Sequence, residues 1–67
     1  MHTETRTELL AALARLSDRE RDLIGLKFAA GLTNRHIAKL ADLRESNVGV
    51  ILYRAMRRLR VELSAKE

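Results

Sequence analysis

Apolar residues recur at helical spacing along nearly the whole chain, beginning with four leucines in its first quarter. Side chains three or four residues apart lie on the same face of an α-helix. This spacing predicts a first amphipathic helix over residues 6–15. Its expected core residues are Leu9, Leu10, Leu13 and Leu16.

A second helix is predicted over residues 18–30 by its start signal and its apolar spacing. Ser17-Asp18-Arg19-Glu20 has the form of a capping box, in which the serine hydroxyl accepts from the Glu20 amide and the glutamate reaches back to Ser17. Gly31 is expected to follow the helix in the left-handed conformation, which glycine adopts without strain. The expected core residues are Leu23, Ile24, Leu26 and Phe28.

A short third helix, residues 34–41, is predicted after Thr33, whose hydroxyl can cap it. His36 stands where a capping box would have a glutamate, and we interpret it as a surface residue. The break Asp42-Leu43-Arg44 follows. The expected inward residues are Ile37, Ala38 and Leu40.

A long last helix is predicted from about Glu45 to about Leu63. At about 100° per residue, its apolar residues form one stripe with Ile51 at the edge, and most of its arginines point elsewhere. The stripe consists of Val48, Leu52, Ala55, Met56, Leu59 and Leu63.

Composition agrees with these helices. The 67 residues include no proline, no cysteine and only three glycines, so little interrupts helix formation. The sequence predicts an all-α protein: a small bundle of about four helices in a single domain over residues 1–67, with residues 1–5 lacking regular structure.

Several classes of function are excluded by the residues present. With no cysteine and only His2 and His36, far apart, we expect no metal and no cofactor. No phosphate-binding glycine loop or paired nucleophile and base occurs, so we expect no enzyme. The longest apolar run, Leu9–Ala14, is too short to cross a membrane. The polar opening residues do not resemble a secretion signal. We therefore expect a soluble intracellular protein.

The excess of positive over negative charge is confined to the second half of the chain. Residues 1–32 carry five basic and five acidic residues, whereas residues 33–67 carry eight basic and four acidic ones, which accounts for the whole net charge of +4. Four arginines fall within residues 54–60, a stretch without an acid: Arg54, Arg57, Arg58 and Arg60. Such a stripe indicates either a polyanion partner or a solvated helix face.

The third and fourth helices have the features of a helix-turn-helix. The first helix of this motif is short and packs closely on the second, and Ala38 and Ala41 permit that. Leu43 can anchor the turn. The second helix of this motif places its N-terminal side chains in the major groove of DNA. Most of residues 45–50, at the start of the last helix, are not needed for core packing. The pattern favours DNA binding, and a purely structural bundle is the alternative.

Four stretches, residues 16–28, 31–38, 47–48 and 53–60, share a family pattern. The first reads Leu-Ser-Asp-Arg-Glu-Arg-Asp-Leu-Ile-Gly-Leu-Lys-Phe, the second Gly-Leu-Thr-Asn-Arg-His-Ile-Ala, the third Asn-Val and the last Tyr-Arg-Ala-Met-Arg-Arg-Leu-Arg. Together they resemble region 4 of bacterial RNA polymerase sigma factors, of the extracytoplasmic-function type, over about residues 9–63. The first two stretches also resemble LuxR-type regulator domains, which have a short additional helix after the recognition helix.

The sigma-factor resemblance implies a cytoplasmic, bacterial function in transcription initiation. Region 4 binds the promoter −35 element as duplex DNA, docks on the flap of the RNA polymerase β subunit, and is often masked by an anti-sigma factor. By position, the base-reading candidates are Glu45, Ser46, Asn47, Gly49 and Val50. The candidates for DNA backbone contact are Arg19, Lys27, Arg35, Arg44, Tyr53, Arg54, Arg57 and Arg58.

Gly49 and Val50 depart from the family pattern, because most members carry long or polar side chains there. Readout of bases would then depend on Glu45, Ser46 and Asn47, with Val50 able to touch a thymine methyl group. Glu45 is equally explained as an acid at a helix start. The surface at Gly49 and Val50 is poor in polar side chains. It therefore also favours an alternative, a protein-interaction module that docks on the polymerase or an anti-sigma factor.

Overall fold

The computed structural model describes the backbone of residues 3–64 and the side chains of residues 5–64. Four α-helices and one π-helical segment follow one another: α1 (Thr3–Ala14), α2 (Asp18–Ile24), η1 (Gly25–Ala29), α3 (Asn34–Ala41) and α4 (Glu45–Ser64). The described part of the chain contains no strand. The structure thus confirms an all-α domain of four helices with a long last helix.

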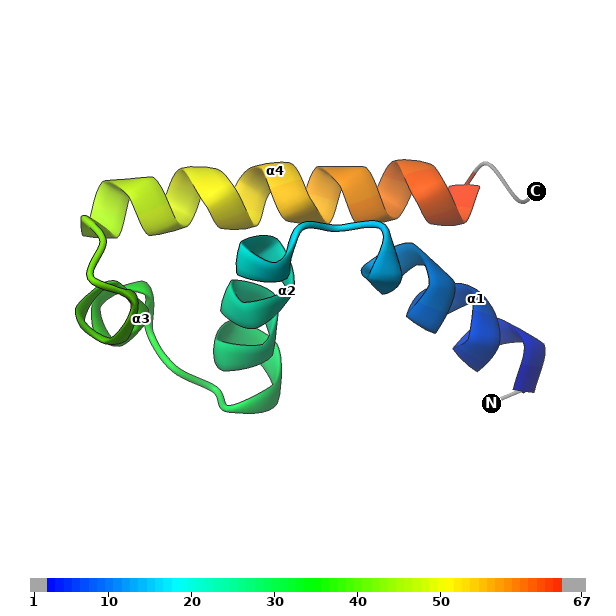
Figure 1. The fold of residues 1–67 in the computed structure, drawn as a ribbon, viewed down its shortest axis with the longest axis horizontal. Coiled ribbons are helices and arrows are strands. Elements are labelled where there is room, and N and C mark those ends of the chain that lie inside the picture. The colour runs from blue at the N-terminus through cyan, green and yellow to red at the C-terminus, as the bar shows by residue number, and fades with distance from the viewer. Residues whose placement is uncertain (1–2, 65–67) are drawn as a thin grey trace.

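Helix α4 forms the long axis of the molecule, and the other helices lie along one side of it (Figure 1). Its 20 residues rise about 30 Å at 1.5 Å per residue, close to the longest dimension of 36 Å. Helix α3 lies near the start of α4, α2 crosses its middle, and α1 lies near its C-terminal half. Among the described residues, the opposite face of α4 is left uncovered.

The core consists of two apolar clusters arranged along α4. The first joins α2, α3 and the first half of α4, and its buried members are Leu23, Ile37, Ala38, Val48 and Leu52. The second joins α1 to the second half of α4, and its buried members are Ala12, Leu16, Ala55 and Leu59. Ile24 packs against both clusters, so α2 connects the two parts of the core.

The helix boundaries follow from the predicted capping residues. Ser17 Oγ accepts from the Glu20 amide at 3.1 Å, and Glu20 Oε1 accepts from the Ser17 amide at 2.8 Å, which confirms the capping box. Thr33 Oγ1 accepts from the His36 amide at 3.2 Å, and α3 has the predicted bounds. Gly31 has φ of +72°, the left-handed conformation expected after a helix end.

Helix α1 is fixed to the body by polar contacts as well as by its apolar edge. Arg21 Nη1 donates to the carbonyl oxygens of Leu13, Ala14 and Leu16 at 3.0–3.3 Å. Carbonyls at a helix end lack partners within the helix, so this guanidinium caps α1 from the side. Arg15 also forms an ion pair with Glu62 on α4.

Several residues that we expected in the core are exposed. Phe28 is 62% exposed, because Leu26 and Leu32 pack against the first cluster in its place. Leu40 is 68% exposed. At about 100° per residue, Ile37, Ala41 and Ala38 span about 100° of α3, and Leu40 lies about 60° beyond Ile37.

Helices α1 and α4 also bury fewer apolar side chains than the spacing predicted. Leu9 and Leu10 are exposed, as is Met56. Helix α1 packs mainly on α4 alone, so only a narrow edge around Ala12 is buried. A domain of this size has too little interior for every apolar residue.

The ends and one interior turn also differ from the prediction. We expected residues 1–5 to lack regular structure, but α1 begins at Thr3; residues 1 and 2 lie outside the described part. The predicted helix over 18–30 is α-helical to Ile24 and π-helical over η1. None of the helices in residues 3–64 combines the length and apolar character that a membrane span requires.

Candidate nucleic-acid interface

Helices α3 and α4 form the predicted helix-turn-helix. Ala38 is buried and Ala41 is half-buried, so their small side chains let α3 approach α4 closely. Asp42 turns the chain in the left-handed conformation, with φ of 57°, and the Leu43 amide donates to the Ala38 carbonyl at 2.9 Å. The Leu43 side chain packs against the first cluster. The anchored turn thereby fixes where α4 begins.

The start of α4 presents its side chains to solvent. The Arg44 carbonyl accepts from the Val48 amide at 3.0 Å, so Arg44 occupies the N-cap position while its side chain is exposed. Val48 is fully buried. Gly49 is half-buried, and the other four base-reading candidates are exposed: Glu45, Ser46, Asn47 and Val50.

These candidates do not all share one face of α4. Measured from buried Val48 at about 100° per residue, Gly49 lies at about 100°, Ser46 at about 160° and Val50 at about 200°. Asn47 lies at about 260°, on the opposite side of the helix from Gly49. Ser46 and Val50 therefore lie near the centre of one outward surface, with Gly49 at one edge and Asn47 at the other.

Gly49 leaves a gap beside the first residue of α3. A Cβ atom built on Gly49 would lie 3.8 Å from Asn34 Nδ2, and within the described chain no other atom outside the helix comes within 4 Å of that position. Asn34 Oδ1 is buried and has no hydrogen-bond partner. Buried polar atoms have a hydrogen-bond partner in the great majority of cases, so the unpaired oxygen of the Asn34 carboxamide is unusual.

The second half of α4 carries the exposed arginines. Arg54, Arg57 and Arg60 are exposed, and none of them forms an ion pair within residues 5–64. Arg58 differs, since its Nη1 lies 3.4 Å from Glu20 Oε1 on α2. Two adjacent arginines, Arg57 and Arg58, thus have different surroundings: one faces solvent and the other is paired across two helices.

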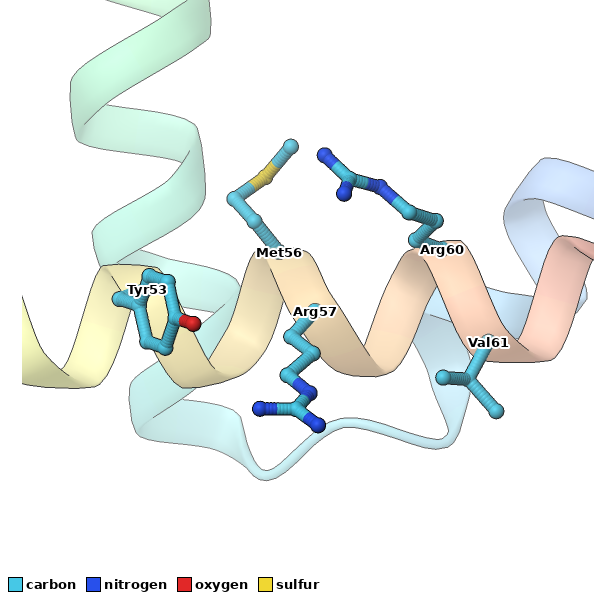
Figure 2. A pocket seen from close by; sticks show the side chains of 5 residues that line it. All are labelled: Tyr53, Met56, Arg57, Arg60 and Val61. Carbon is cyan, nitrogen blue, oxygen red and sulfur yellow. The ribbon is translucent and has the colours of Figure 1, made fainter.

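A hollow of about 340 Å³ lies on the uncovered face of α4. Figure 2 shows Tyr53 and Arg57 on the front of the helix, with Met56 and Arg60 projecting from one edge of it. Val61 completes the lining. Tyr53 and Val61 are 66% and 61% exposed, so this surface combines positive charge with apolar area.

The remaining candidates come from α2, η1 and α3. Arg19 lies in the first turn of α2 and Lys27 in η1; eight residues separate them, which is about 12 Å along a helix at 1.5 Å per residue. Arg19 and Arg35 are exposed, whereas Lys27 is half-buried. Because Glu20 meets Arg58, the Arg19 end of α2 lies toward the second half of α4. Arg19 and Lys27 are therefore not brought together.

Two features of the site were not evident from the sequence. Asn34 was not among the candidates, and the pairing of Arg58 with Glu20 joins residues 38 positions apart. Helical spacing could have placed Gly49 and Arg58 on α4, but the approach of α3 and α2 to those places depends on the tertiary fold. Residues 5–64 contain no group of three histidine, aspartate or glutamate side chains arranged to hold a metal ion.

Comparison with known families gives one match. A family model described as "Sigma-70, region 4" matches residues 6–59, which are 54 of the 67 residues, and it covers the helix-turn-helix and most of α1. None of the curated proteins and none of the solved structures compared with the chain matches it. Helix α4 runs without a break to Ser64, so the additional helix of a LuxR-type domain does not begin within the described residues.

Proposed function

Because the chain belongs to the sigma-70 region 4 family, we propose that it recognises the promoter −35 element as duplex DNA within a bacterial sigma factor. Region 4 is a non-enzymatic DNA-binding domain, and membership implies binding to promoter DNA and RNA polymerase in transcription initiation. The observation that carries the proposal is the anchored turn before α4, which leaves the first turns of that helix exposed. This role belongs to the bacterial cytoplasm.

The proposed docking places the start of α4 in the major groove, as the second helix of a helix-turn-helix. Ser46 and Val50 face outward together, with Gly49 at one edge of this surface and Asn47 at the other. These four residues and Glu45 are proposed to meet base edges.

The proposed phosphate contacts surround this surface. Half or more of the hydrogen bonds in protein–DNA complexes go to phosphate and sugar, and they fix the orientation of the protein. Two arginines of α4 without an internal partner, Arg54 and Arg57, are proposed to supply such contacts, together with the exposed arginines near the motif. The proposed set is Arg35, Arg44, Arg54 and Arg57, with Arg19, Lys27 and Tyr53 at its margins, whereas Arg58 is engaged by Glu20 and is left out of it.

A second candidate function is supported by the apolar part of the uncovered face. Tyr53, Met56 and Val61 are exposed beside the hollow on α4, and apolar area of this kind is common at protein interfaces. We propose that region 4 also docks on the β flap of RNA polymerase, and that an anti-sigma factor competes for the same domain. In this alternative, protein docking is the main activity and DNA contact is minor.

The test is a titration of the 67-residue chain against labelled promoter-like duplexes at several salt concentrations, followed by fluorescence anisotropy. If about four phosphates are neutralised, log K should fall with log salt at a slope of about −3 to −5. Binding by the isolated domain is expected with Kd of about 10⁻⁴–10⁻⁶ M. A flat salt response would exclude the proposal.

Charge reversal distinguishes the two functions. The double variant Arg54→Glu/Arg57→Glu should lose DNA binding, because two proposed phosphate contacts become repulsive. Binding of the same variant to RNA polymerase core is measured in parallel. If DNA binding is unchanged while polymerase binding is lost, the protein-interaction function is the correct one.

A further inference from the structure

We propose that Asn34, the first residue of α3, contacts a base through the gap that Gly49 leaves in the recognition helix. This inference rests on the proposed function, because it adds a base-reading residue to the same DNA surface. A residue of α3 would then make the base contact that a long side chain at position 49 of α4 would otherwise make.

The position of Asn34 provides the first argument. Its Nδ2 atom lies 3.8 Å from the point where a Cβ of Gly49 would be, and within the described chain that direction is otherwise open. Gly49 lies about 60° around α4 from Ser46, at about 100° per residue, and Ser46 is exposed on the outward surface. The Asn34 carboxamide therefore lies at the edge of the surface proposed to enter the major groove.

The unpaired oxygen provides the second argument. Asn34 Oδ1 is buried without a partner, whereas a buried acceptor normally receives a hydrogen bond. Thr33, and not Asn34, caps α3, so the Asn34 side chain is not needed to cap the helix. Rotation of the carboxamide toward the groove would remove the unpaired buried oxygen and offer both its ends to DNA.

The chemistry of the carboxamide selects the ligand. Phosphate oxygens only accept, so a phosphate contact would use Nδ2 and still leave Oδ1 without a donor. Adenine presents an acceptor at N7 and a donor at N6 in the major groove, and asparagine pairs with both. The proposed contact is therefore to the edge of an adenine.

The experiment selects bound sequences from a pool of duplexes with random base pairs, using the 67-residue chain and three variants at one salt concentration. The wild-type chain should enrich an adenine at one position. Asn34→Ala should lose that preference alone, by about 5- to 140-fold, the range for one bidentate base contact. Asn34→Asp carries only acceptors and should shift the preference to cytosine, whose N4 group donates.

Arg35→Gln is the matched control, because Arg35 is the exposed neighbour proposed to meet a phosphate. It should weaken binding to all sequences alike. Circular dichroism of each variant tests whether the helices are retained. Retention is expected in Asn34→Ala, since alanine favours helix more than asparagine does.

The outcomes separate this inference from the function on which it rests. If the wild-type chain enriches no sequence in the selection, the role of Asn34 is overturned. If its separate anisotropy titration also shows no salt dependence, the proposed function fails with it. If the wild-type chain enriches a sequence and Asn34→Ala enriches the same one, only the role of Asn34 is overturned. A uniform loss of affinity in Asn34→Ala, without a change of preferred base, also overturns it.

Discussion

Replacing Arg57 and Arg58 one at a time by glutamine should separate DNA binding from stability. The two residues are adjacent on α4, yet Arg57 faces solvent without an ion pair in residues 5–64, and Arg58 lies 3.4 Å from Glu20. Arg57→Gln should remove one phosphate contact, and Arg58→Gln should remove one contact between α4 and α2. The same substitution at neighbouring positions makes each variant the control of the other.

The expected magnitudes follow from these surroundings. Loss of one phosphate contact should reduce the slope of log K against log salt by about 0.9. The Arg58 side chain is 60% exposed and that of Glu20 is 17% exposed, so their ion pair is a surface pair worth about 0.2–1 kcal/mol. In a domain of this size, that loss lowers Tm by about 1–8 °C. Arg57→Gln should change the free energy of unfolding by less than about 0.5 kcal/mol.

The two measurements are anisotropy titrations with duplex DNA at four salt concentrations and thermal unfolding followed by circular dichroism. Arg57→Gln should change the slope and keep Tm, and Arg58→Gln should lower Tm and keep the slope. Equal slope changes in both variants would show that pairing with Glu20 does not keep Arg58 from the phosphates. An unchanged slope in Arg57→Gln would remove that residue from the proposed DNA contacts.

Three further predictions concern the fold. Leu23→Ala should lower the free energy of unfolding by about 2–5 kcal/mol, a large part of the roughly 3–10 kcal/mol expected for a domain of this length. Leu40→Ala, at an exposed site, should lower it by less than about 0.5 kcal/mol. Equal losses in urea unfolding would contradict the assignment of the core. Gly31→Ala should destabilise by about 1–2 kcal/mol through its left-handed backbone alone, since no atom of the described chain lies within 4 Å of the added Cβ. An unchanged Tm would refute that reason. Ser17→Ala should cost about 0.5–2 kcal/mol, with amide exchange rising first at Glu20; uniform exchange would argue against a capping role.

Much of the fold was predictable because it depends on local interactions. The capping box at Ser17, the cap at Thr33 and the left-handed Gly31 each involve residues within a few positions of one another. The bounds of α3 and α4 therefore followed closely from the sequence. Family membership was also predictable, because the matching stretches are spread over about residues 9–63.

The failures share a cause, which is that spacing shows a face but not what covers it. Leu40 and Phe28 lie at helical spacing from core residues, yet both are exposed. A small domain buries only one side of each helix, and the neighbouring helices decide which side that is. Leu26 and Leu32 fill the place expected for Phe28.

The sequence by itself determined the four helices, the turn before the last one and the excess of positive charge in the second half. These properties arise from backbone capping, helical period and composition, and each is local. Only the tertiary structure decided which arginines remain free, because pairing of Arg58 with Glu20 requires α2 to cross α4. It also brought Asn34 to Gly49, since contact between residues on different helices depends on how those helices pack.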